Sequence, residues 1–172
     1  MQLGLTWPLQ GLLKLKNVPY GQPLARKFCW DAHCITLRGR SSLLLVHCAS
    51  RYTCLRFDMT SADWAQLDSI VLEEIREGLL DAGFSETAVE QYLADCGAVE
   101  RTRPHGRREV AYLNRAWEAV LAADWLLDES THHQLLLGGA VNGAPCRCAE
   151  FTETDTALAH LRRSLGEQEE PC

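Results

Sequence analysis

The chain has 172 residues and a mass of 19.3 kDa, which is the size of one domain. A hydrophobic fraction of 47%, with 6 prolines and 12 glycines, excludes a disordered or collagen-like protein. The charged fraction of 23% and the formal net charge of -6 are typical of an ordinary soluble protein. We expect a single α+β domain over residues 1–166, followed by an acidic tail, residues 167–172, that frays.

Charge is segregated along the sequence. Residues 1–57 carry a net charge of +7, with Asp31 as their only acid, and residues 58–100 carry -10. Residues 101–115 carry +4 and residues 116–172 carry -7. Because elements that are adjacent in sequence tend to share a layer, this pattern predicts one basic and one acidic surface. The alternative is that helices carry solvated acids while strands carry basic residues at their edges.

The sequence contains no membrane or export signal that we recognise. It has no run of about 18 apolar residues, and its start has neither a basic region nor a long apolar stretch. We therefore expect a cytoplasmic protein that does not engage a membrane. In a reducing compartment its eight cysteines are expected to be free thiols, most of them buried as small apolar residues. These cysteines are Cys29, Cys34, Cys48, Cys54, Cys96, Cys146, Cys148 and Cys172.

The first third of the sequence predicts short strands. Leu3 and Leu5 alternate with Gln2 and Gly4, which indicates a strand over residues 2–6, and a short helix follows over 9–16. A loop with two prolines then leads to a segment in which the period changes to two. Its three apolar runs, separated by short turns, are typical of antiparallel hairpins. These runs cover residues 29–37, 43–49 and 53–57.

The remainder predicts helices with one further strand. Thr60 and Asp63 resemble a capping box at the start of a helix. The predicted helices cover residues 61–82, 86–96, 107–127 and 154–165, with a strand over 98–103. Residues 135–141 are apolar but contain two glycines, so they receive no assignment. His132 and His133 fall in a polar loop and are expected to be solvated.

These elements predict an α+β fold. Its sheet would be antiparallel, with four to five strands built from residues 2–6, 29–57 and 98–103. The helices of residues 61–82, 86–96 and 107–127 would pack mainly on one face of this sheet.

Four segments carry a recognisable pattern in a fixed order. They are Leu3-Gly4-Leu5-Thr6 with the run ending Leu13-Lys14-Leu15-Lys16, then Trp30-Asp31-Ala32-His33, then residues 79–84, and then 102–114 with Arg107 and Asn114. Together they resemble a family of small uncharacterised bacterial proteins, a domain of unknown function, whose hairpin more typically reads Trp-Tyr-Ala-Asn. The resemblance covers about residues 1–120. It implies an α+β fold and a bacterial or mobile-element origin, and it implies no activity.

Basic residues cluster where a turn enters the helix predicted to start at Arg107. Free N–H groups at a helix N-terminus, together with arginine forks, favour an anion. Asn114 lies about two turns further along the same helix face, where it would orient a ligand or anchor the helix. Trp7 and Trp30 are the tryptophans expected at the surface, near the basic half. The candidate binding residues are Arg101, Arg103, His105, Arg107, Arg108, Asn114, Trp30 and His33. The alternative is that these arginines pair with acidic helices of the same chain.

Cysteine and histidine residues fall on adjacent predicted strands, but their spacing does not predict a metal site. Structural zinc sites use pairs such as Cys-x2-Cys, and the sequence contains no such pair. On a strand, Cys29, Asp31 and His33 share one face. His47 and Cys48 are adjacent and face opposite sides, so they cannot form a catalytic dyad by themselves. We therefore predict no metal, no cofactor and no catalytic residue.

The leading prediction is a non-enzymatic binding protein that engages a protein or a nucleic acid through its basic surface. Antitoxin, phage-defence and anti-defence roles are compatible with this prediction, as is a homodimer. The competing prediction is a small enzyme that acts on an anionic substrate, either a phosphate or a carboxylate. In that enzyme Arg103 and Arg107 would clamp the substrate, with His33 or His105 as acid or base.

Overall fold

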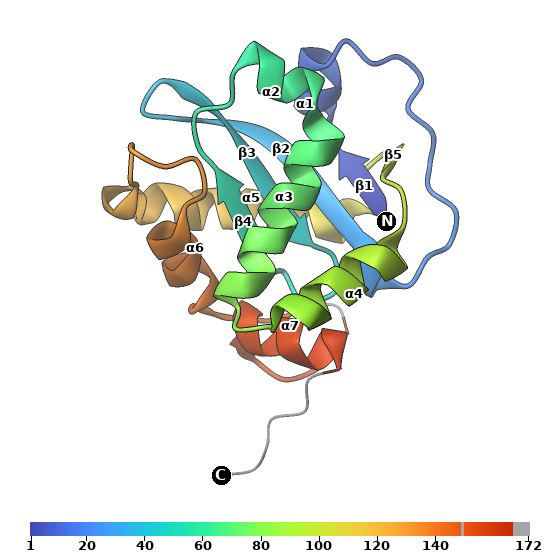
Figure 1. Cartoon of the computed structure of the whole chain (residues 1–172), viewed down its shortest axis with the longest axis vertical. Coiled ribbons are helices and arrows are strands. Elements are labelled where there is room, and N and C mark those ends of the chain that lie inside the picture. The colour runs from blue at the N-terminus through green and yellow to red at the C-terminus, as the bar shows by residue number, and fades with distance from the viewer. Residues whose placement is uncertain (149, 167–172) are drawn as a thin grey trace.

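A five-stranded mixed sheet lies at the centre of the computed structural model, which describes residues 1–148 and 150–166 (Figure 1). The strands run in the order β4-β3-β2-β1-β5. Their bounds are β1 Gln2–Leu5, β2 Cys29–Leu37, β3 Arg40–His47, β4 Thr53–Arg56 and β5 Glu100–Thr102. The predicted acidic tail, residues 167–172, lies outside the described residues.

The sheet combines antiparallel and parallel pairs. Strands β2, β3 and β4 form the predicted antiparallel hairpins. Strand β1 runs parallel to both of its neighbours, with Leu3 opposite Trp30 of β2 and Arg101 of β5. The prediction of an antiparallel sheet is therefore wrong for β1. The connection from β1 to β2 contains helix α1, Trp7–Leu12, and a long loop, which returns the chain to the edge where β1 began.

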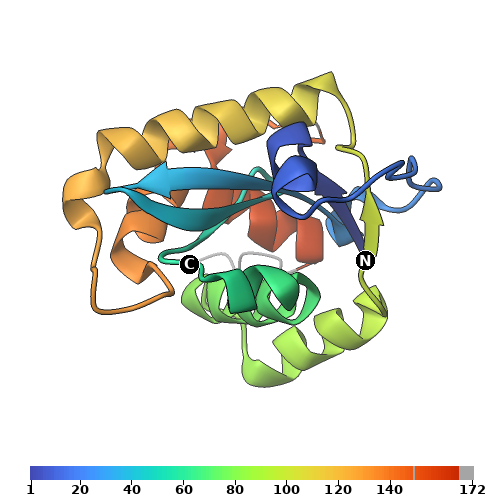
Figure 2. The same ribbon diagram turned by 90° about the horizontal axis from the view of Figure 1, so that it is seen from above.

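Helices cover both faces of the sheet, so the prediction of one covered face is also wrong. Helices α3, Leu67–Asp81, and α4, Glu86–Cys96, lie on one face, and α5, Arg107–Ala122, lies on the other (Figure 2). In β3, Leu43 and Leu45 pack in the core beneath α3, whereas Leu44 and Val46 pack in the core beneath α5. Residues 43–46 form an unbroken apolar run because neither face of the strand is exposed to water.

The other elements are short helices, two 3-10 turns and a second sheet of two strands. Thr60 and Asp63 form the predicted capping box of α2, Ser61–Ala65. The remaining bounds are α6 Leu135–Asn142, α7 Ala157–Leu165, β6 Pro145–Cys146, β7 Asp155–Thr156, and two short 3-10 turns at Arg26–Phe28 and Asp124–Leu126. None of the described helices combines the length and the apolar composition that crossing a membrane requires. The seven cysteines among the described residues are free.

A buried ionic network ties the loop before α6 to α3. Glu74 is fully buried, and its Oε1 lies 2.7 Å from His133 Nδ1. Asp81 Oδ2 lies 2.6 Å from His133 Nε2, and Arg56 lies 3.8 Å from the second oxygen of Glu74. Burial alone would lower the pKa of His133, but the hydrogen bonds and charges of Glu74 and Asp81 raise it to about 9. The prediction that His133 is solvated is wrong because the fold packs its loop against α3.

This network predicts a pH dependence of stability. The pKa of His133 is about 9 in the folded state and near 6.5 when the chain is unfolded, so its stabilisation is complete below pH 6.5 and is lost as pH rises through about 9. We expect a loss on the order of 2 kcal/mol across this window. Urea unfolding of the wild type and of His133→Gln at several pH values isolates this histidine. Parallel stability curves for the two proteins would contradict the assignment.

Candidate functional site

The face of β2 that lies beneath α5 is polar in the first part of the strand and apolar in the last part. Ile35 and Leu37 pack in the core beneath α5. Because side chains alternate along a strand, Cys29, Asp31 and His33 share that face, as the sequence predicted. The turn that precedes α5 closes over Asp31, whereas His33 packs against Trp117 in the second half of α5. The sheet and the helix thus enclose a polar region at one end of an otherwise apolar interface.

An ion pair between Asp31 and His105 occupies the centre of this region. Asp31 is 1% exposed, and its Oδ1 lies 2.6 Å from His105 Nδ1. The backbone N–H of His105 also donates to the same carboxylate, at 3.3 and 3.4 Å from its two oxygens. Cys48 Sγ lies 3.5 Å from His105 Nδ1. His105 Nε2 is buried and finds no hydrogen-bond partner among the described residues.

Gly4 makes room for this pair. A Cβ atom at Gly4 would overlap the carboxylate of Asp31 and would lie 2.9 Å from the backbone Cα of Pro104. The carboxylate therefore rests directly on the backbone of β1, with the 104–105 turn close above it. Strand β1 and the turn before α5 fix the position of the pair through close backbone packing.

The protonation states in this region follow from burial and from neighbouring charges. Burial by itself would lower the pKa of His105, but the hydrogen bond and the charge of Asp31 raise it to about 9. Burial raises the pKa of the Cys48 thiol well above its usual value, and the charge of Asp31 adds to this effect. At neutral pH the cysteine is therefore a thiol and the histidine an imidazolium. Neither group is a nucleophile or a general base in that state.

Asp31, Cys48 and His105 also place three possible metal-binding atoms within 4.8 Å of one another. A tetrahedral zinc ion with bonds of about 2.1 Å to oxygen and nitrogen would hold those two atoms roughly 3.3 Å apart. The observed separation of 2.6 Å between Asp31 Oδ1 and His105 Nδ1 is that of a direct hydrogen bond. As arranged, these residues form an ion pair and do not fit a metal centre.

A second buried acid in this region has its own basic partner. Glu109, in the first turn of α5, has a side chain that is 4% exposed and forms an ion pair with Arg26. The hydrogen bond to Glu109 raises the pKa of Arg26 despite partial burial. Asp31 and Glu109 are thus each matched by one cation. The charges of the two pairs cancel, so this region supports the surface above it and leaves no net charge for a ligand.

Arg103 lies at the entrance to this region and has no carboxylate partner among the described residues. Its Nε donates to the carbonyl oxygen of Val18 at 2.9 Å, and its Nη1 donates to the hydroxyl of Tyr20 at 3.2 Å. The guanidinium carbon lies 4.7 Å from the ring centroid of Tyr20 and 5.6 Å from that of Trp7. Both aromatic side chains are strongly exposed, at 73% and 70%. Arg103 is therefore held in one orientation with its charge available.

Two hollows meet at Arg103. One, of about 260 Å³, reaches inward to Arg26, Cys48 and His105. The other is a shallow depression of about 320 Å³ on the outside. We use the name Trp7–Arg103 surface for the main side chains of this outer depression, which are Trp7, Tyr20, Arg103, Arg107 and Val110.

The structure separates the other predicted site residues. Arg101 forms an ion pair with Asp68 at 2.8 Å, as the alternative prediction had it. Arg107 and Asn114 are exposed on one face of α5. Arg108 is also exposed, but helical spacing places it on the other flank of α5, near Arg115.

The remaining two predicted residues have different environments. Trp30 is fully buried, where its Nε1 donates to Tyr92 at 3.0 Å, so the prediction that it lies at the surface is wrong. Strand β2 carries Trp30 on the face beneath α3, opposite Asp31. His33 is half-buried, bonded to Thr6 at 2.8 Å and packed edge-on against Trp117. Burial lowers the pKa of His33.

Sequence reasoning did not assign Asp31, Cys48, Glu109 or Tyr20 to the site. One signal could have found Asp31, because it is the only acid among the first 57 residues. A lone acid in a basic segment, predicted to lie on a strand, needs a cationic partner if it is buried. The adjacent His47 is no partner for Cys48, because it faces the opposite side and bonds to Ser50 at 2.7 Å, whereas Cys48 lies 3.5 Å from His105, which no sequence pattern links to it.

Comparison with known proteins agrees with the resemblance seen in the sequence. No curated protein matches the chain. The model of one protein family does match, and it covers residues 2–154, which include β1, the Trp30 hairpin, α5 and the segment up to β7. Since this match spans most of its length, the chain belongs to the family described as Domain of unknown function (DUF6933).

Proposed function

We propose that this chain is a non-enzymatic binding protein that holds single-stranded nucleic acid on its Trp7–Arg103 surface. The observation that carries the proposal is that Arg103, without a carboxylate partner in the described structure, lies against two exposed aromatic rings. Proteins that bind single strands combine arginines that follow the phosphates with aromatic side chains on which bases stack. Trp7 and Tyr20 would supply the stacking, and Arg103 and Arg107 would supply the charge.

The distribution of charge supports this orientation of the partner. Helices α3 and α4 carry eight acidic residues and one arginine, and they lie on the opposite face of the sheet from α5 (Figure 2). A polyanion would therefore be repelled from that face. Arg107 lies at the N-terminal end of the 16-residue helix α5, where the helix dipole adds to its charge.

The competing proposal of a small enzyme has less support from the geometry. His105 or His33 would have to act as acid or base. The pKa of about 9 keeps His105 protonated at neutral pH, so it is unsuited as a base. As an acid, His105 has its Nδ1 bound to Asp31 at 2.6 Å and its Nε2 buried. His33 is bonded to Thr6 and is not among the residues that line the inner cavity. Arg103 and Arg107, the clamps of such an enzyme, would serve equally well to bind a ligand without catalysis. We place the binding function in the cytoplasm, where the free cysteines would remain reduced.

Fluorescence anisotropy with a labelled oligothymidylate of about 16 nucleotides tests the proposal. Arg103→Ala and Trp7→Ala are each expected to weaken binding about tenfold, since loss of a stacked ring or a phosphate contact costs roughly 1–3 kcal/mol. For Arg103→Ala, the slope of log affinity against log salt should also decrease by about 0.7. Melting temperatures should change little, because both side chains lie at the surface.

Arg40→Ala is the control, because Arg40 is an exposed arginine already paired with Asp58. It should bind the oligonucleotide like the wild type. If the wild type does not bind the oligonucleotide but retains an acidic protein in a manner sensitive to Arg103→Ala, the partner is a protein and the nucleic-acid proposal fails. Equal losses in Arg103→Ala and Arg40→Ala would show only a general charge effect and would also contradict it.

A further inference from the structure

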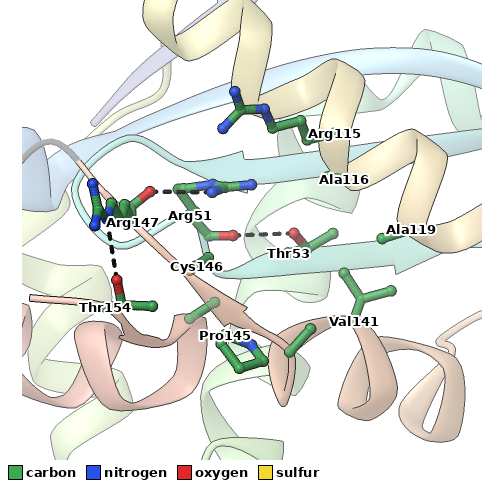
Figure 3. Close-up of a pocket in the computed structure, with 12 residues that line it drawn as sticks. Arg51, Thr53, Arg115, Ala116, Ala119, Val141, Pro145, Cys146, Arg147 and Thr154 are labelled. Carbon is green, nitrogen blue, oxygen red and sulfur yellow. Dashed lines mark hydrogen bonds between the residues drawn. The ribbon is translucent and has the colours of Figure 1, made fainter.

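A second basic site lies on the other flank of α5, away from the Trp7–Arg103 surface. It is a cavity of about 430 Å³ between α5, the turn after β3 and the segment around β6 (Figure 3). Three arginines line it, each from a different segment: Arg51 from the turn, Arg115 from α5, and Arg147 from the residues after β6. No carboxylate is among the residues that line it. None of the three arginines forms an ion pair with another described residue.

Two of these arginines are held in place by contacts within the cavity. Arg51 Nη1 donates to the backbone carbonyl of Arg147 at 3.1 Å, and its guanidinium carbon lies 4.7 Å from the ring centroid of Tyr112. Arg147 Nε donates to Thr154 Oγ1 at 3.1 Å. Figure 3 shows Arg51 and Arg147 side by side, with Arg115 extending from α5 above them. The cavity therefore presents oriented guanidinium groups.

One buried donor of the Arg51 side chain is unsatisfied. Its Nε is buried and has no hydrogen-bond partner among the described residues. Its Nη1 and the face of its guanidinium are engaged by Arg147 and Tyr112, as described above. The Nε is therefore the buried donor that remains for a partner from outside the chain.

Electrostatics and shape together define that partner. Three like charges around one cavity repel one another, and an anion with several oxygens relieves the repulsion while accepting from the guanidinium forks. The rest of the lining is largely apolar and includes Ala116 and Ala119 of α5 together with Val141, Ala144 and Pro145. A volume of this size is in the range of small-molecule sites. We propose that this cavity binds a small organic phosphate monoester, with the phosphate on the arginines and an apolar group against the alanines.

This inference is independent of the proposed nucleic-acid surface, because the two sites share no lining residue. Phosphate oxygens could come from a monoester or from a nucleic-acid backbone, so the experiment compares both. The probes are phenyl phosphate, benzoate and the oligothymidylate. Isothermal titration calorimetry should show saturable binding of phenyl phosphate in the millimolar range or tighter, and weaker binding of benzoate.

Variants of the exposed arginines test the site. Arg115→Gln and Arg147→Gln are each expected to raise the dissociation constant of phenyl phosphate at least tenfold, because each removes a charge-assisted hydrogen bond. Arg40→Gln is the control, since Arg40 is an exposed arginine that is paired with Asp58 and lines neither the cavity nor the Trp7–Arg103 surface. It should leave phenyl phosphate binding unchanged. Arg115 makes no hydrogen bond or ion pair within the described structure, so its variant should also keep the wild-type melting temperature.

Four results would overturn the proposal. They are no saturable binding of phenyl phosphate in the millimolar range, equal losses in Arg40→Gln and the two cavity variants, benzoate binding as tight as that of phenyl phosphate, and displacement of phenyl phosphate by the oligonucleotide. The last result, with weaker oligonucleotide binding by Arg115→Gln, would assign the cavity to the nucleic-acid backbone. The Trp7–Arg103 proposal is judged separately, by Arg103→Ala.

Discussion

Replacing Asp31 by asparagine is expected to lower the pKa of His105 well below its value of about 9. Burial, which remains in the variant, lowers this pKa, and the carboxylate is the largest contribution that raises it, ahead of Cys29. Titration of the histidine ring signals by NMR measures the change directly. We also expect the free energy of unfolding to fall by about 2 kcal/mol at neutral pH, because a buried charge-assisted hydrogen bond is lost.

The pH dependence of this destabilisation has a defined sign. The imidazolium form alone gains from the carboxylate, and its folded pKa lies above the unfolded value of 6.5. The difference between wild type and Asp31→Asn should therefore be largest between the pKa of Asp31, which burial raises, and pH 6.5, and should shrink as pH rises through about 9. Asp58→Asn is the control, because Asp58 forms an exposed pair with Arg40 that should contribute less than about 1 kcal/mol. An unchanged His105 titration in Asp31→Asn would refute the pairing.

Replacing Gly4 by alanine is expected to destabilise the protein by about 3 kcal/mol, which is the upper range for overpacking. The new methyl group would overlap the carboxylate of Asp31 and crowd the backbone at Pro104. Strand β1 is hydrogen-bonded on both sides, so it cannot move away without losing pairs to β2 or β5. Displacement of Asp31 should also lower the pKa of His105, which links this variant to the first one.

Gly139→Ala provides the matched control for Gly4→Ala. Gly139 lies inside α6, and a Cβ atom there would meet nothing within 4 Å. Alanine at this position should raise the free energy of unfolding by roughly 0.5–1 kcal/mol, because it stabilises the helix and restricts the unfolded chain. Chemical denaturation of both variants measures the two effects. A Gly4→Ala protein as stable as the wild type would show that the Asp31 carboxylate does not rest on β1.

Helix α5 connects the two proposed ligand sites. One of its flanks carries Arg107 and Val110 beside Trp7, and the other carries Arg115 beside Arg51. Its central face packs on the sheet through residues such as Leu113 and Val120. A helix with arginines on both flanks of its buried face presents positive charge to both sides without placing any in the core.

Local sequence patterns predicted most of the secondary structure. Strand β2 has the predicted bounds of 29–37, and helix α4 has the predicted bounds of 86–96. Helix α5 ends at Ala122, before the predicted residue 127, where the chain continues into a 3-10 turn. The apolar run of residues 43–46 also carried a signal of burial on both faces, which the assumption of one covered face overlooked.

What the sequence by itself determined is local: the periods of two and of about 3.6 residues, the capping box at Thr60, the segregation of charge and the family. The tertiary structure alone decided that β1 pairs in parallel, that Asp31 meets His105, and that Arg51, Arg115 and Arg147 line one cavity. Asp31 and His105 are 74 residues apart. Periodicity reports which face of an element is buried, but it does not report the direction in which a long connection returns. Contacts between distant residues depend on that direction, so the periodicity of each element does not predict them.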